Sequence, residues 1–243
     1  MPTPMFPVAI MSIYRKHGQR VPLPQRMARA TADMLVAIQG VGEALEAQGG
    51  HVYVSDLFRS YEMQLQSHLD WKTKKKSAFS PVPGGSMHEA GRALDLDLDS
   101  LGIELKDFWP IARAHGLSPI ISTPNPDVSE AWHFDCRGSH DLVYKHYKNG
   151  KGNNFDKPYE AMAASAILSI GVEVDKLDGK QNEAAVQSAL IRLGQDIGNM
   201  DGVLGKQTED GLAQVGVAIS DPTNMLTALE EKLKVVFPTE FKD

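Results

Sequence analysis

The sequence predicts an α+β domain followed by a small all-α domain, and three observations indicate this division. Up to about residue 147, segments with the apolar spacing of helices alternate with short strand-like segments, an arrangement typical of α+β proteins. The stretch "ALDLDLD" (93–99) alternates apolar and acidic residues with period two, as a half-buried strand does. After the polar segment 148–158, only helical patterns follow. We therefore expect one domain over residues 1–150 and a second over 151–243.

Within the first domain, we expect helices over residues 24–48, 60–76 and 103–116. The first has apolar residues at intervals of three and four, and two glycines follow it as a stop signal. We expect strands over 51–58 and 93–99, and irregular chain after residue 117 that leads into another strand ending near residue 136.

The second domain contains an internal repeat. "SAILSIGVEVDKLDG" (165–179) matches "SALIRLGQDIGNMDG" (188–202) at an offset of 23 residues. Each copy predicts a short helix, a glycine stop, a loop and an Asp-Gly turn. The same pattern also suits two ordinary helical hairpins.

Composition excludes several classes of function. The net charge of −6 argues against general nucleic-acid binding, which requires a basic surface. No stretch reaches the roughly 18 apolar residues of a membrane span. The N-terminal residues lack the features of a signal peptide, so we expect synthesis in the cytoplasm without a leader. The single cysteine, Cys136, excludes an intramolecular disulfide and is interpreted as a small buried side chain.

The acidic strand and two histidines predict a metal site. Three aspartates on one strand face repel one another, and a bound cation would relieve that repulsion. His88, Asp95 and His133 offer imidazole nitrogen and carboxylate oxygen, the ligands of catalytic zinc, which keeps three protein ligands and one open position. We expect one zinc ion per chain. Asp97 and Asp99 also suit a calcium site, but the rest of a calcium loop is missing.

Further candidates surround these ligands. Glu130 would act as general base for metal-assisted hydrolysis, provided that the chain bends between Glu130 and His133, because positions three apart on a straight strand face opposite sides. Arg59 would stabilise the oxyanion. Trp132 lies between Glu130 and His133 and would form a wall of the pocket.

Three motifs resemble the zinc D-Ala-D-Ala peptidases, peptidase family M15. "SMHEAGRALD" resembles the SxHxxGxAxD motif of that family, "EAWH" its ExWH motif, and "FRSYEMQ" its Arg-Ser-xxx-Gln segment, in the family's order. The resemblance implies the Hedgehog/D,D-peptidase type of fold with a small antiparallel sheet. It implies the same three zinc ligands, the same general base, and Arg59 at the oxyanion or substrate. Candidate substrate-binding residues are Ser60, Gln64, Ser86 and Trp132, with Ser86 either facing substrate or supporting a ligand.

The C-terminal repeat resembles the small three-helix peptidoglycan-binding domain. Leu193-Gly194 precede Asp201, Gly202, Gly205 and Thr208, which match the aliphatic-Gly pair and the Asp-Gly-x-x-Gly-x-x-Thr signature. The family's Phe-Gln near the last helix is replaced by "AQVG".

Together these resemblances imply a monomeric zinc metallopeptidase that hydrolyses peptide bonds in peptidoglycan stem peptides. Two activities remain open, a D,D-carboxypeptidase and a lytic endopeptidase. The latter would be a phage-type endolysin, released from the cytoplasm to act in cell wall degradation. Two alternatives remain as well: a cytoplasmic D-Ala-D-Ala dipeptidase of the vancomycin-resistance type, and a non-catalytic cell-wall-binding protein.

Overall fold

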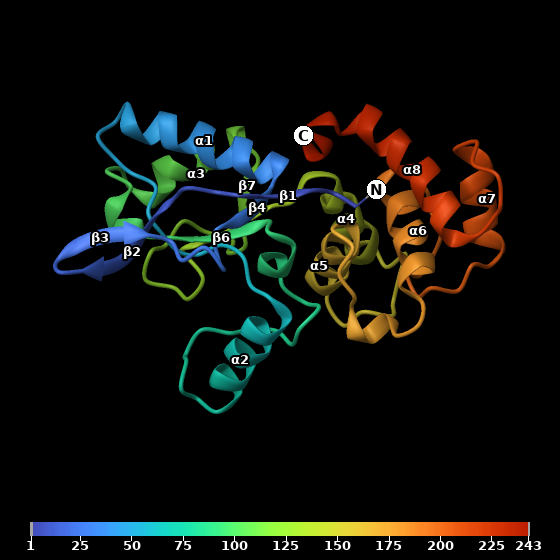
Figure 1. Ribbon diagram of the computed structural model, residues 1–243, viewed down its shortest axis with the longest axis horizontal. Coiled ribbons are helices and arrows are strands. Elements are labelled where there is room, and N and C mark those ends of the chain that lie inside the picture. Colours follow the sequence, from blue (N-terminus) through green and yellow to red (C-terminus); the bar gives the residue numbers. More distant parts are fainter. Residues whose placement is uncertain (1, 243) are drawn as a thin grey trace. The chain divides into compact units, whose positions relative to one another are not determined.

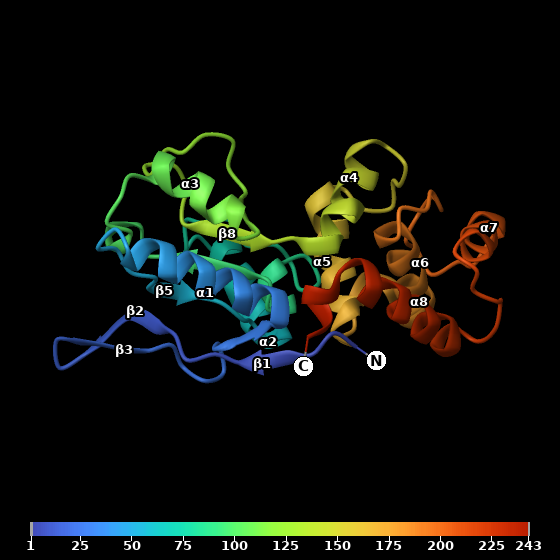
Figure 2. The same ribbon diagram turned by 90° about the horizontal axis from the view of Figure 1, so that it is seen from above.

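The structure, a computed structural model, describes residues 2–242 (Figures 1 and 2). The chain is α+β, with a mixed sheet and, in these residues, eight α-helices. It divides into two compact units. A sheet unit comprises Pro4–Ser80 and Met87–Arg137, and a helical unit comprises Gly138–Lys242, Pro81–Ser86 and the chain start up to Thr3.

The sheet unit contains all the strands and three α-helices. Its strands are β1 (Met5–Pro7), β2 (Met11–Lys16), β3 (Gln19–Pro22), β4 (Arg29–Thr31), β5 (Val54–Asp56), β6 (Ala93–Leu96), β7 (Leu117–Pro119) and β8 (His133–Cys136). Its helices are α1 (Ala32–Glu46), α2 (Tyr61–Lys72) and α3 (Leu105–Ala114), with short 3-10 helices η1 (Met87–Ala90) and η2 (Leu98–Ser100).

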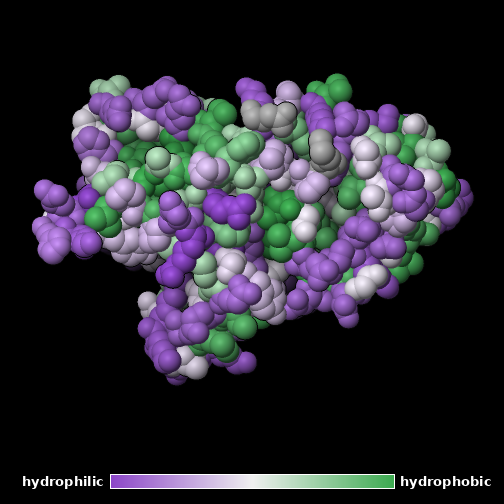
Figure 3. All heavy atoms as spheres, viewed as in Figure 1, coloured by the Kyte–Doolittle hydropathy of each residue, from purple (hydrophilic) through white to green (hydrophobic). Residues whose placement is uncertain are grey.

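The main sheet has the strand order β3-β2-β5-β6-β8-β7, and β1 pairs with β4 separately. The main sheet is mixed, whereas the resemblance implied an antiparallel sheet: β2 runs parallel to β5, and the other pairs of the main sheet are antiparallel. The β2–β3 hairpin, which supplies this parallel strand, was not expected from the sequence. Hydrophilic side chains cover the tip of that hairpin, at the left of Figure 3.

The two faces of the sheet differ. Leu94 lies opposite Phe134, and Asp95 lies opposite His133. Leu94 and Phe134 are buried in the main core with residues of α1 and α3, which lie on one side of the sheet (Figure 1). Because successive side chains on a strand alternate between faces, Asp95 and His133 point away from this core.

Several predicted elements are shorter than expected. The helix expected over 24–48 begins only at Ala32. Residues 24–28 form a turn, and the next three residues form β4, which pairs with β1 and ends at Thr31, the N-cap of the helix. The strand expected over 51–58 is reduced to β5. The strand expected over 93–99 ends at Leu96, because the chain turns into η2 directly after Asp97. The helix expected over 103–116 is present as α3, with Pro110 inside it.

The helical unit contains five α-helices among the described residues. They are α4 (Asp141–Lys148), α5 (Pro158–Ser169), α6 (Gln181–Arg192), α7 (Lys206–Gln214) and α8 (Pro222–Val236), with short 3-10 helices η3 (Gly138–His140), η4 (Asp175–Leu177) and η5 (Pro238–Phe241). This exceeds the expected three. The unit also begins before residue 150, because α4 packs against α5 and α6.

The sequence repeat is also a repeat of backbone conformation. Gly171 and Gly194, which follow α5 and α6, have φ values of 76° and 85°, and the glycines of the two Asp-Gly turns have φ values of 68° and 73°. All four lie in the left-handed region that favours glycine.

None of the helices within residues 2–242 combines the length and the apolar character needed to cross a membrane.

Candidate metal centre

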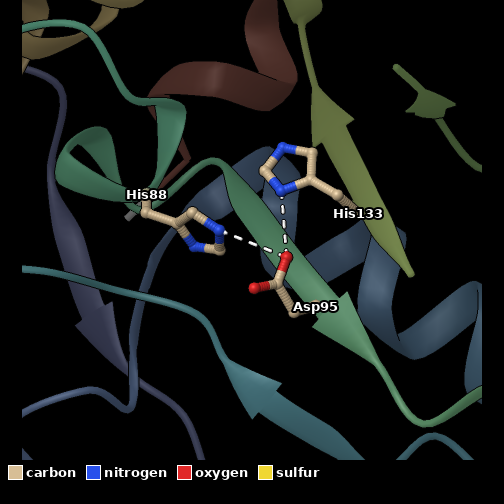
Figure 4. A group of neighbouring side chains, drawn as sticks. All are labelled: His88, Asp95 and His133. Atoms are coloured by element: carbon tan, nitrogen blue, oxygen red, sulfur yellow. Dashed lines mark hydrogen bonds and ion pairs between the residues drawn. The ribbon is translucent and has the colours of Figure 1, made fainter. Parts of the chain in front are cut away.

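Three side chains from different elements converge on the open face of the sheet. His88 comes from η1, Asp95 from β6 and His133 from the start of β8. Asp95 Oδ1 lies 3.4 Å from His88 Nε2 and 2.9 Å from His133 Nδ1, and Figure 4 shows both imidazoles directed at this carboxylate. One possible ligand atom from each residue lies within 4.8 Å of the other two.

The remaining nitrogen of each imidazole has its own hydrogen-bond partner. His88 Nδ1 lies 2.8 Å from the carbonyl oxygen of Leu57, and His133 Nε2 lies 3.0 Å from Asp135 Oδ1. In metal sites a histidine ligand usually donates its other N–H to a carbonyl or carboxylate, which sets the ring orientation. Both rings therefore present the nitrogen that faces Asp95 as the atom available to a metal.

The local sequence explains how His88 and Asp95 meet. Gly91, between them, has a φ of 64°, and a Cβ there would lie only 2.9 Å from Met5 Sδ and 3.2 Å from Ala30 Cα. The chain thus turns tightly from η1 into β6 at a position that favours glycine. Antiparallel pairing with β8 then places Asp95 beside His133.

The ligands are strongly coupled electrostatically. Burial alone would raise the pKa of Asp95, but the two histidines hold that pKa well below its usual range. Burial alone would lower the pKa of His133, but hydrogen bonds and charge interactions with Asp135 and Asp95 raise that pKa to about 10. A pKa raised in this way favours the protonated form of His133, whose two ring nitrogens each face a carboxylate.

The chain bends between Glu130 and His133, as a role for Glu130 at this site requires. The N–H of His133 donates to the carbonyl of Glu130 at 3.0 Å, and Glu130 has a φ of 69°. The chain therefore makes a tight turn just before β8, with a non-glycine residue in a left-handed conformation that is uncommon and often found at functional sites. Burial raises the pKa of Glu130, and the charges of His133, Asp95 and His88 also act on it.

Arg59 is a buried neighbour of the same carboxylate. Its Nη2 lies 3.6 Å from Asp95 Oδ2, on the side of the carboxylate away from the histidines. Its Nε donates to Asp56 Oδ2 at 2.6 Å, and its Nη1 donates to Gln64 Oε1 at 3.1 Å. These contacts hold the guanidinium in one orientation at the edge of the cluster.

The other predicted site residues occupy different positions. Gln64 is fully buried behind Arg59 and donates to Ser80 Oγ at 3.0 Å. Ser60 caps the N-terminus of α2 by accepting from the Met63 N–H. Ser86 is buried directly before η1. Half-buried Trp132 accepts a hydrogen bond from the Leu96 N–H through its carbonyl.

Three residues of this centre were not predicted from the sequence. Asp135 follows His133 by two positions on a strand, a spacing that places both on one face and could have revealed it. Asp56 precedes Arg59 by three residues, which is a weaker signal. Tyr14 on β2 donates to the Ser55 carbonyl at 2.8 Å. Burial and the charges of Asp56 and Asp95 raise the pKa of Tyr14, and nothing local in the sequence indicated this proximity.

The cluster fits a metal ion. Zinc bonds of about 2.0–2.1 Å in tetrahedral geometry separate two ligand atoms by about 3.3 Å, close to the 2.9 Å and 3.4 Å found around Asp95 Oδ1. Two imidazoles, one of which must first lose a proton, and one carboxylate also match the ligand types of divalent transition metals. His88, Asp95 and His133 could therefore hold a metal ion.

Comparison with known proteins adds no relative: no protein-family model matches the chain, and no curated protein matches it.

Proposed function

We propose that this protein is a zinc-dependent peptidase of the D-Ala-D-Ala peptidase type that hydrolyses peptide bonds in peptidoglycan stem peptides. The observation that carries the proposal is the arrangement of the two imidazoles around Asp95 Oδ1, each with its second nitrogen held by a separate acceptor. Such preparation of both rings is a characteristic of metal ligands. The three sequence motifs of family M15 contribute the remaining support.

When bound by His88, Asp95 and His133, zinc supplies Lewis acidity that polarises the scissile carbonyl and acidifies water. Glu130 accepts the proton of the attacking water and delivers it to the leaving amine. The charges of the ligand residues act on the Glu130 carboxylate, and burial raises its pKa. A raised pKa suits a group that must both take up and release a proton.

Arg59 provides the fixed positive charge. Negative charge develops on the carbonyl oxygen in the transition state, and a guanidinium that is already oriented stabilises it without reorganisation. Asp56 and Gln64 hold that orientation, so we assign Gln64 a positioning role instead of the substrate contact expected from the sequence.

The helical unit supports a cell-wall substrate. Its repeat ends each copy with an Asp-Gly turn whose glycine is left-handed, consistent with the resemblance to peptidoglycan-binding domains. We propose an endolysin-like role for the whole chain. A dipeptidase acting on free D-Ala-D-Ala would need no such unit.

The test is mass spectrometry of purified peptidoglycan and of a free stem pentapeptide after incubation with zinc-loaded protein, with a chelated sample as control. Loss of one terminal D-Ala would establish a D,D-carboxypeptidase, and a cut between L-Ala and D-Glu would establish an endopeptidase. Hydrolysis of D-Ala-D-Ala alone would favour the dipeptidase. Absence of any zinc-dependent product would refute the proposed hydrolysis.

The Glu130→Gln variant separates catalysis from binding. It removes the proton acceptor and leaves the three ligands intact, so we expect loss of most turnover with unchanged zinc content. If this variant hydrolyses stem peptides at the wild-type rate, Glu130 is not the general base.

A further inference from the structure

Lys76 differs from the other lysines at the end of α2. Residues 72–76 include four lysines, of which Lys72, Lys74 and Lys75 are exposed and Lys76 is half-buried. The Nζ of Lys76 donates to Ser67 Oγ at 3.1 Å. Within residues 2–242, no carboxylate lies at ion-pair distance from this ammonium group. Its positive charge is therefore available to an anionic group that binds beside it.

The loop after α2 turns back along the helix (Figure 1) and holds Lys76 against it. Lys74 has a φ of 62°, the left-handed conformation that often ends a helix. The N–H of Lys76 then donates to the carbonyl of Asp70, within the last turn of α2, at 3.1 Å. Farther along the loop, Phe79 packs edge-on against Trp71, with ring centroids 4.8 Å apart. The position of Lys76 is therefore fixed by backbone and side-chain contacts on both sides of it.

Hydrogen bonds connect Lys76 to the arginine of the candidate metal centre. Ser67 Oγ, which accepts from Lys76, also accepts from Ser80 Oγ at 3.0 Å. Ser80 Oγ in turn accepts from Gln64 Nε2 at 3.0 Å. Gln64 Oε1 accepts from Arg59 Nη1 at 3.1 Å. All five residues belong to the sheet unit, so this chain of contacts fixes the two cations relative to each other.

Glu130 provides a second indication that Lys76 faces the centre. Burial raises the pKa of Glu130, and the positive charge of Lys76 acts against that rise. Because the interaction between two charges weakens with distance, the ammonium group lies near enough to influence the proposed general base. The two groups form no ion pair among the described residues, so Glu130 does not neutralise the charge of Lys76.

The charge of Lys76 favours an anionic group of the substrate. Arg59 already faces Asp56 and Asp95, whereas Lys76 faces a neutral hydroxyl. A metal ion or a substrate amine would be repelled by the ammonium group, and an apolar group would gain nothing from its charge. A carboxylate forms a charge-assisted hydrogen bond with an ammonium group, about twice as strong as a neutral one. Carboxylates are also the anionic groups that unmodified peptides carry.

We propose that Lys76 binds a carboxylate of the substrate peptide and thereby determines which peptides the centre accepts. The proposal rests on the proposed peptidase function and adds to it a specificity-determining residue from the loop after α2. The carboxylate belongs either to the C-terminus of the peptide or to an acidic residue within it, and the experiment distinguishes these two sources. A structural role, in which Lys76 only fastens the loop to Ser67, predicts no dependence on the charge of the substrate.

The test compares three forms of one stem pentapeptide: unmodified, amidated only at the C-terminus, and amidated only at its acidic residue. With the zinc-loaded protein, we expect one of the two amidations to lower kcat/KM by about tenfold, mainly through KM, as the loss of a hydrogen bond to a charged group predicts. Calorimetry with the zinc-loaded Glu130→Gln variant measures the affinity for the same three peptides without hydrolysis.

Substitutions of Lys76 assign the effect to this residue. In Lys76→Met the penalty for amidation should vanish, because the unmodified peptide loses the same factor. Lys76→Arg keeps the positive charge and should retain most of the penalty. Lys75→Met removes the charge of the exposed neighbouring lysine; as the matched control, it should keep the full penalty.

The outcomes separate the two proposals. Equal hydrolysis of the three peptides by the wild type would overturn the role of Lys76 and leave the peptidase function standing. The same holds if Lys76→Met loses activity on all three peptides by the same factor, which is the result of a structural role. If no peptide is hydrolysed, the proposed function fails, and calorimetry still decides whether Lys76 binds the carboxylate.

Discussion

Zinc binding at the candidate centre should release a proton from His133. The pKa of His133 is raised to about 10 because both ring nitrogens lie against carboxylates. A zinc ion must replace the proton on Nδ1, while the proton on Nε2 remains directed at Asp135. Asp95 releases none near neutral pH, because its pKa is already held well below its usual range.

The cost of releasing this proton follows from the difference between the working pH and the pKa of His133. At pH 7 the protonated form of His133 exceeds the neutral form by about a thousandfold, a cost of about 4 kcal/mol to the apparent free energy of zinc binding. Because the raised pKa keeps His133 protonated below about pH 10, protons compete with zinc over this range. Zinc affinity should therefore rise with pH, by about tenfold per unit between pH 7 and pH 9.

Competition with a chromophoric chelator at pH 7, 8 and 9, corrected for the chelator's own protonation, measures this slope. Calorimetry at pH 8 in buffers of different ionisation enthalpy counts the released protons directly. His51→Gln changes an exposed histidine outside the centre and should keep the wild-type slope. A zinc affinity independent of pH between 7 and 9 would refute the assignment of His133 Nδ1 as a protonated ligand atom.

Three further predictions follow from particular contacts. Asp135→Asn should weaken zinc binding by about 10–100-fold, measured by the same competition, because it removes the carboxylate that orients His133. Gln64→Leu should lower kcat/KM by about tenfold with unchanged zinc content, since a hydrogen bond to a charged group such as Arg59 contributes about 1.5–3 kcal/mol. Glu240→Ala should lower the free energy of unfolding by about 3–5 kcal/mol in a urea titration, because the buried Arg192 guanidinium loses the carboxylate that pairs with it; an unchanged midpoint would contradict this.

The parts of the site that could be predicted depend on short-range patterns. The period-two alternation placed Asp95 on the face opposite Leu94, and antiparallel pairing with β8 confirms that geometry. The positive φ of Gly91 agrees with a tight turn between His88 and Asp95. These features depend on residues that are close together in the sequence, so local sequence patterns can predict them.

The parts that could not be predicted depend on non-local pairing. Tyr14 reaches Ser55 only because β2 pairs in parallel with β5, a contact across 41 residues. Short apolar segments carry no information about the partner strand, so neither the hairpin nor the mixed sheet was expected. Likewise α4 follows the sheet in sequence, but it belongs to the helical unit because its buried side chains pack on α5 and α6.

The three aspartates of the acidic strand are tolerated because each has a different environment. Asp95 faces two histidines and Arg59, and Asp97 is paired with Arg20. Asp99 is exposed to water, where a carboxylate needs no partner. Only Asp95 lies in β6, whereas Asp97 precedes η2 and Asp99 lies within it, so the repulsion among the three carboxylates is offset locally, without one ion shared by all three. The strand therefore supplies a single metal-ligand candidate, and the two carboxylates that follow its end are accommodated by an ion pair and by solvent.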